Sequence, residues 1–195
     1  MKELLDKVFE AFSDHFEPMP EEEIIQDLID RFNLYQDSNG LWNCDGDVDL
    51  TEQGFVQLPL RFGVVKGDFD CSYNELTTLE GAPQSVGSNF GCSGNELTTL
   101  EGAPQSVRGN FWCYYNHLTS LEGAPQSVGE SFDCSYNRLT TLRGAPQSVG
   151  GYFDCSYNQL TTLEGAPQSV GGWFGCTGNP LPPNELKQTV SRMYL

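Results

Sequence analysis

The sequence predicts an α/β solenoid in which short parallel strands are stacked along one side and helices close the two ends. Three observations lead to this fold class. A unit of 21 residues repeats through about two thirds of the chain, each unit contains one short strand pattern, Phe-x-Cys, and helical patterns occur only near the termini. The repeated cysteines are Cys71, Cys92, Cys113, Cys134, Cys155 and Cys176.

One copy of the unit shows why it should stack. It runs from residue 151 to residue 171 as GYFDCSYNQLTTLEGAPQSVG. In a strand Phe153 and Cys155 point to one side and Asp154 to the other. Parallel strands lie about 4.8 Å apart, so each Phe should lie over the next Phe and each Cys over the next Cys. Asn158 is expected to bond backbone groups at the turn, in its own coil and the next.

The unit matches the leucine-rich repeat, L-x-x-L-x-L-x-x-N/C-x-L, with Phe and Cys in place of two aliphatic residues. This match predicts a horseshoe whose parallel sheet lines a concave face. The return segment from Leu163 to Val170 contains Gly165 and Pro167, which forbid a helix. We therefore expect an extended, partly polyproline-like convex side.

The chain divides into four predicted parts. Residues 1–36 are expected to form an N-terminal helical hairpin or cap, residues 37–68 a turn and an atypical first coil, residues 69–181 the repeats, and residues 182–195 a C-terminal cap with a short helix. Alternatively, the N-terminal hairpin is a second binding site or a dimer contact, and in the latter case the protein forms an oligomer through these helices. Its two apolar stripes are Leu4, Leu5, Val8, Phe9 and Phe12, and Ile24, Ile25, Leu28, Ile29 and Phe32.

The seven cysteines do not indicate a metal or disulfide site. No C-x-x-C pair occurs, and cysteines stacked in adjacent parallel strands are poorly placed for a disulfide. They are expected to be reduced, buried fillers. The acids between Asp45 and Asp49 resemble the start of a calcium loop, but Leu50 and Val56 occupy the places where Gly and Glu are needed. We expect no metal and no cofactor.

Catalytic residues are scarce, so the protein is not expected to be an enzyme. The only histidines are His15, in a predicted helix, and His117, in a variable turn. Neither has a plausible Ser or Cys partner. Asp133 and Asp154 should lie on adjacent strands, but nothing predicts a deep cleft around this carboxylate pair.

The net charge of −17 restricts the possible partners. An acidic surface repels phosphate, which argues against direct binding of nucleic acid or an anionic membrane, and favours a protein partner with a basic surface. The alternative is that acidity only keeps the protein soluble. No apolar stretch is long enough to span a membrane, and no secretory signal is visible, so a cytoplasmic location is expected.

The outward strand positions vary between repeats, whereas the core and return positions hardly change. Exposed Tyr and Trp are typical of binding surfaces. For the tyrosines that recur at one position, the alternative is a simple packing ladder along the sheet edge. The predicted partner-binding residues are Asp68, Asp70, Tyr73, Trp112, Tyr114, Tyr115, Asp133, Tyr136, Tyr152, Asp154, Tyr157 and Trp173.

Residues 48–181 resemble the short leucine-rich repeats of bacterial type III secreted effectors, and more closely the repeats of phage-encoded and bacterial proteins built on an LTSLEGAP unit. The resemblance implies a horseshoe-like solenoid and protein binding. The expected function is an interaction module that binds and modulates or inhibits a host or partner protein, in the host cytoplasm if the protein is phage-encoded. The alternatives are an acidic nucleic-acid mimic that blocks a DNA- or RNA-binding defence enzyme and, less favoured, a small enzyme or carbohydrate binder.

Overall fold

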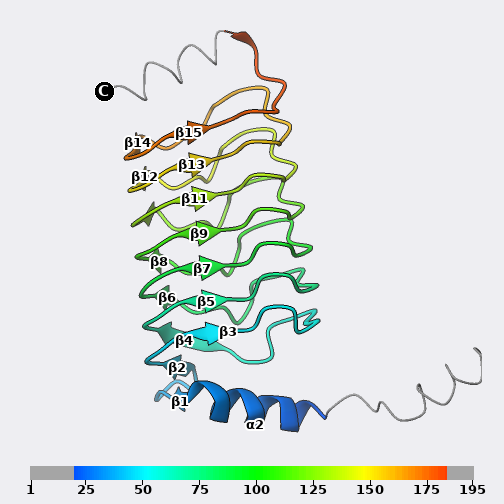
Figure 1. Cartoon of the computed structure of the whole chain (residues 1–195), viewed down its shortest axis with the longest axis vertical. Coiled ribbons are helices and arrows are strands. Elements are labelled where there is room, and N and C mark those ends of the chain that lie inside the picture. Colours follow the sequence, from blue (N-terminus) through cyan, green and yellow to red (C-terminus); the bar gives the residue numbers. More distant parts are fainter. Residues whose placement is uncertain (1–19, 184–195) are drawn as a thin grey trace, which may run out of the picture.

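The computed structural model describes residues 20–183 and shows a β-solenoid with one helix at its N-terminal end (Figure 1). Each coil contributes one strand to each of two sheets, which we call the Phe sheet and the Ser–Val sheet. The Phe sheet contains β3 (Val48–Asp49), β5 (Phe69–Asp70), β7 (Phe90–Gly91), β9 (Phe111–Trp112), β11 (Phe132–Asp133), β13 (Phe153–Asp154) and β15 (Phe174–Gly175). The Ser–Val sheet contains β1 (Tyr35–Gln36), β2 (Trp42–Cys44), β4 (Phe62–Val65), β6 (Ser85–Val86), β8 (Ser106–Val107), β10 (Ser127–Val128), β12 (Ser148–Val149) and β14 (Ser169–Val170). All pairings are parallel except that of β1 with β2.

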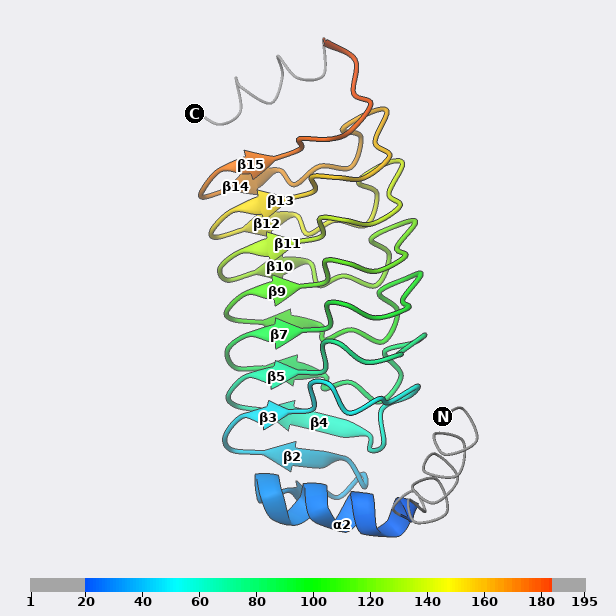
Figure 2. The same cartoon turned by 45° about the vertical axis from the view of Figure 1, so that its right-hand side comes forward.

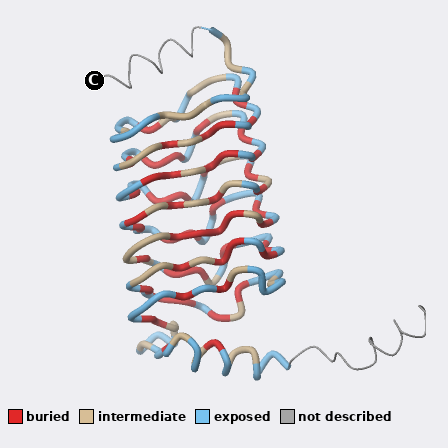
Figure 3. The backbone as a smooth tube through the Cα atoms, in the orientation of Figure 1, coloured by how far each residue is buried: buried red, intermediate tan, exposed pale blue. Residues whose placement is uncertain are grey.

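The core consists of rows of identical side chains, as the repeat predicted. Neighbouring strands pair in register, for example Phe132 with Phe153, and consecutive phenylalanine rings from Phe69 to Phe174 have centroids 5.0 to 5.9 Å apart. The rings from Phe69 to Phe153 and most of the leucine and valine rows are buried, whereas Phe174 in the last coil is partly buried (Figure 3 colours the backbone by burial). No single coil encloses this apolar surface, so stability depends on stacking.

The return side differs from the expected polyproline-like segment. Its Ser–Val pairs are extended, but they hydrogen-bond to neighbouring coils as a second parallel sheet. Both sides of each coil therefore repeat at the strand spacing of about 4.8 Å. A solenoid bends when one side is wider than the other, and equal spacing gives the nearly straight column of Figures 1 and 2. This column does not show the curvature of the predicted horseshoe.

A glycine fixes the turn before each Ser–Val strand. Gly123 has a φ of 92°, a conformation that strongly favours glycine. A Cβ at this position would lie 2.3 Å from the carbonyl carbon of Leu100 in the preceding coil. The Gly of the repeated LEGAP segment therefore permits both the turn and the close stacking of the coils.

The asparagine row joins successive coils, as expected, but toward the preceding coil. Asn116 accepts a hydrogen bond from the Leu97 backbone N–H at 3.1 Å. Its amide donates to the Cys92 carbonyl of the preceding coil at 3.0 Å and to the Cys113 carbonyl of its own coil at 3.2 Å. The amide thereby satisfies buried backbone groups of two coils at once.

At the N-terminal end, α2 (Glu21–Phe32) lies next to β1 and β2 and packs against the core. Three glutamates occupy its first turn, where negative charge suits the helix dipole, and Asn33 ends it in the left-handed conformation. Leu28 is buried in the core, and the Phe32 carbonyl accepts a bond from the Cys44 thiol. This helix confirms the second helix of the predicted hairpin. The first predicted helix and the predicted C-terminal helix lie outside the described residues.

The cysteines from Cys44 to Cys155 form no disulfide. Cys44 and the five from Cys71 to Cys155 are buried, while Cys176 is partly exposed. Burial raises the pKa of Cys71, Cys92, Cys113, Cys134 and Cys155. Within residues 20–183, no group of His, Cys, Asp and Glu side chains is arranged to hold a metal ion. The one described helix is too short to cross a bilayer.

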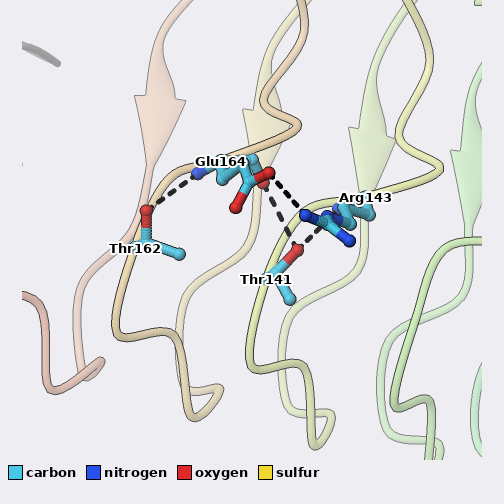
Figure 4. Close-up of polar contacts among 4 residues, drawn as sticks. All are labelled: Thr141, Arg143, Thr162 and Glu164. Atoms are coloured by element: carbon cyan, nitrogen blue, oxygen red, sulfur yellow. Dashed lines mark hydrogen bonds and ion pairs between the residues drawn. The ribbon is translucent and has the colours of Figure 1, made fainter.

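An exposed charged row marks the turn that precedes each glycine. It contains Glu80, Glu101, Glu122, Arg143 and Glu164. The Arg143 guanidinium bonds to the Glu164 carboxylate at 2.7 Å, while Thr141 and Thr162 accept bonds from the backbone N–H groups of these two residues (Figure 4). Arg143 thus interrupts a row of like charges that adjacent coils bring close together.

Candidate binding surface

The outer side of the Phe sheet, with the residue before each strand and the turn after it, carries all twelve predicted binding residues. Every one of them is partly or largely exposed. The register places equivalent positions of successive coils side by side, for example Asp133 beside Asp154. We call this surface the aromatic–acidic face, comprising Asp68, Asp70, Tyr73, Trp112, Tyr114, Tyr115, Asp133, Tyr136, Tyr152, Asp154, Tyr157 and Trp173.

Five tyrosines form a ridge along the edge of this face, which we call the tyrosine ridge. The rings of Tyr115, Tyr136 and Tyr157 stack with centroids 4.4 and 4.5 Å apart. Tyr114 packs edge-on against Tyr115, and its hydroxyl lies 3.4 Å from that of Tyr73. The hydrogen bond with Tyr73 and, after it, burial raise the pKa of Tyr114 to about 12, so it is a neutral phenol at physiological pH. The tyrosines therefore pack as a ladder, yet the four outer rings remain 41 to 53% exposed.

The backbone under the ridge is in an uncommon conformation. Tyr73, Tyr115, Tyr136 and Tyr157 all have φ between 52° and 57°, in the left-handed region that disfavours residues other than Gly, Asn and Asp. Two other coils have glycine at the same position, Gly94 and Gly178. A non-glycine residue there costs on the order of 1 kcal/mol. Tyrosine is thus present where glycine suits the backbone better.

A second aromatic cluster lies toward the C-terminal coils. The Tyr152 and Trp173 rings stack nearly parallel with centroids 4.7 Å apart. Burial and the nearby Asp133 raise the pKa of Tyr152. Burial also raises the pKa of Asp133, despite bonds from Ser135. The cluster therefore combines partly buried aromatic rings with a partly desolvated carboxyl group.

The carboxylates on the strands are partly exposed, and they also have a structural role. The Oδ1 atoms of Asp70, Asp133 and Asp154 each accept a bond of 2.9 Å from the backbone N–H two residues later, at Ser72, Ser135 and Ser156. This is the Asx-turn pattern. It fixes the orientation of each carboxylate, and the Ser135 side chain bonds to Asp133 as well.

A row of polar side chains immediately before the phenylalanines was not recognised from the sequence as a hydrogen-bonded ladder. The Asp68 carboxylate accepts bonds from the backbone and the side chain of Asn89, and the Asn89 amide oxygen does the same for Asn110. Although burial opposes it, hydrogen bonding from Ser88 and Asn89 holds the pKa of Asp68 below its usual value. The signal was the recurrence of short acceptors, Asp, Asn and Ser, at this position. Asp68 therefore connects coils in addition to facing solvent.

An open hollow of about 400 Å³ interrupts the face at Gly91. Asp70 and Trp112 lie on the two strands beside this glycine. The other lining residues are Asp47, Val48, Asp49, Thr51, Asp68, Phe69 and Asn89.

His117, the one described histidine, pairs with Glu96 at 2.7 Å in the row beyond the tyrosine ridge.

Sequence comparisons with family models and with curated proteins give no match.

Proposed function

We propose that the protein is a binding module that docks a basic protein surface on its aromatic–acidic face. The observation that carries this proposal is the tyrosine ridge. Three stacked rings remain about half exposed, at positions where the backbone favours glycine and two other coils use it. An exposed aromatic row retained against backbone preference is better explained by contact with a partner than by packing alone.

Charge selects the kind of partner. The face combines the aromatic rings with Asp68, Asp70, Asp133 and Asp154, and the whole chain carries −17. A second copy of the chain or a nucleic acid is repelled by this charge, whereas a basic protein is attracted to it. The aromatic rings supply apolar contact area, and the carboxylates steer association and orient the partner.

The finer assignments follow from the sequence resemblance. We propose that each coil is a variant leucine-rich repeat with a second sheet in place of the usual convex segment, and that the partner is a host protein which the module modulates or inhibits. The uniform Ser–Val sheet supports this division, because its outer positions hardly vary while those of the aromatic–acidic face do.

The test is affinity capture from a bacterial lysate with matched variants. A D133N/D154N/W112A variant removes two charges and one ring, and Asn retains the Oδ1 acceptor of each turn. The control is Q105A/Q126A on the Ser–Val side. We expect the native protein and the control to retain the same basic protein, identified by mass spectrometry, and the face variant to lose it. Equal capture by all three proteins would refute the proposal.

A further inference from the structure

The aromatic–acidic face has one gap in which a carboxylate and an indole lie on opposite sides of a position without a side chain. Strand pairing places Gly91 between Asp70 and Trp112. A Cβ at Gly91 would lie 2.5 Å from the Asp70 Oδ1 atom, so the carboxylate leans over the glycine. We call this gap the Trp112 notch. It belongs to the hollow of about 400 Å³, a size within the range of about 300–1,000 Å³ for small-ligand pockets.

We infer that the Trp112 notch is a subsite for a guanidinium group, supplied by an arginine side chain of the partner. This inference rests on the proposed function and names the chemistry that the face recognises. A guanidinium is planar, so it stacks on an indole while its N–H groups donate to a carboxylate. Asp70 and Trp112 lie on the two strands beside the notch, and both line the hollow.

The Asp70 carboxylate is oriented before any ligand arrives. The Ser72 backbone N–H donates to its Oδ1 atom at 2.9 Å, and no described residue donates to Oδ2. Asp47, Asp49 and Asp68 also line the hollow, and hydrogen bonding keeps the pKa of Asp68 low. The surroundings therefore favour a cation at neutral pH.

Other occupants fit less well. A metal ion needs several converging ligands, and residues 20–183 contain no group of three such side chains arranged to bind one. The indole wall also contributes nothing to a metal ion. A lysine ammonium would be attracted to the same carboxylates, but it lacks the flat face that matches the ring. The combination of one indole and one fixed carboxylate selects arginine.

The experiment is a titration of the full-length protein with N-acetyl-arginine amide, compared with N-acetyl-lysine amide at equal ionic strength. Binding is followed by NMR through the backbone amide of Ser72, which is present in every variant. We expect the arginine amide to shift this signal saturably and at lower concentration than the lysine amide. The W112L variant should weaken arginine binding about fivefold to tenfold, as expected for loss of a cation–π contact.

Two further variants distinguish binding in the notch from nonspecific attraction of a cation to an acidic protein. G91L fills the gap without changing charge, and its Cβ would also displace the Asp70 carboxylate, so the variant removes both the space and the carboxylate position that the notch needs. It should abolish saturable binding. Q105L places the same leucine on the Ser–Val side, outside the aromatic–acidic face, and should leave binding unchanged. Equal binding of the two amides, or native-like arginine binding by W112L and G91L, would overturn the inference.

Failure of the arginine subsite can be told apart from failure of the proposed function. The amide titration needs no protein partner, so a saturable notch without any captured protein would refute the function and leave the subsite standing. Conversely, a captured basic protein whose retention survives G91L and W112L would support the function and overturn the arginine subsite.

Discussion

The asparagine row makes a quantitative prediction about stability. Asn116 is buried, and its side chain bonds to Leu97, Cys92, Cys113 and Tyr114. In an N116A variant the Leu97 N–H loses its side-chain acceptor. The three carbonyls lose one donor each but retain others, because Asn95 and Asn137 also donate to the two cysteine carbonyls and Gly94 to that of Tyr114.

The expected cost follows from this difference. One orphaned buried N–H costs about 1–3 kcal/mol, and the lost bonds add roughly 1 kcal/mol, so N116A should lower the free energy of unfolding by about 2–4 kcal/mol. The measurement is urea denaturation followed by circular dichroism. N179A is the matched control, since Asn179 makes equivalent bonds in the last described coil but is partly exposed. It should cost less than N116A.

An isosteric N116D variant tests the same reasoning without creating a cavity. One oxygen still accepts from Leu97, but the other faces the Cys92 and Cys113 carbonyls, so the buried carboxylate should have a raised pKa in the folded state. The folded protein then binds a proton more tightly than the unfolded chain, and the destabilisation should be greatest at neutral pH and shrink as pH falls. Surface substitutions typically change the free energy of unfolding by up to about 0.5 kcal/mol. If the free energies of unfolding of N116A and the native protein differ by no more than this, the asparagine row does not satisfy these groups as argued.

Four further outcomes are expected. R143E should create an uninterrupted row of five glutamates and lower the free energy of unfolding by a few tenths of a kcal/mol. In urea titrations, 0.5 M salt should largely remove this loss. An equal loss of stability at low and high salt would point to packing instead. The buried thiols should react with a thiol reagent only after denaturation, whereas prompt reaction of most of them in the native protein would contradict the burial of the cysteine row. Among the described residues β3 is the last strand of the Phe sheet, with Asp49 on it and Asp47 just before it, so a D47T/D49V variant should self-associate in sedimentation experiments, and a monomeric variant would argue against charge protection of this edge. Hydrogen bonds lower the folded-state pKa of Asp68, so the ionised carboxylate stabilises the folded protein above its unfolded pKa of about 3.9. This stabilisation is lost as pH falls through the lower folded-state pKa, and the stability of D68N should therefore depend less on acid. An unchanged acid-unfolding curve for D68N would exclude this contribution.

The core was predictable because its signal repeats. Phe and Cys recur every 21 residues, and that period alone implies stacked parallel strands with Phe132 over Phe153. The Ser–Val sheet was not predicted, because strands of two residues following Pro show no alternating pattern and their pairing depends on coils 21 residues away. The same omission led to the expectation of a curved sheet.

The candidate surface was predicted in part. Alternation identified the outward residues correctly, since all twelve are at least partly exposed. It gave no indication that Asp68 belongs to a ladder, that the tyrosines adopt positive φ, or that Gly91 opens a hollow beside Trp112. Each of these depends on contacts between coils, which a single strand pattern does not contain.

The equal spacing of the two sheets makes the column a molecular ruler. Equivalent positions of different coils are separated along the column by a whole number of steps of about 4.8 Å. Trp112 and Trp173 are on coils three steps apart, so removing one complete 21-residue unit between them would bring the two indoles closer by one step without bending the column. Gain or loss of units therefore offers a way to match contact sites to a differently sized partner while leaving the local geometry of every coil intact.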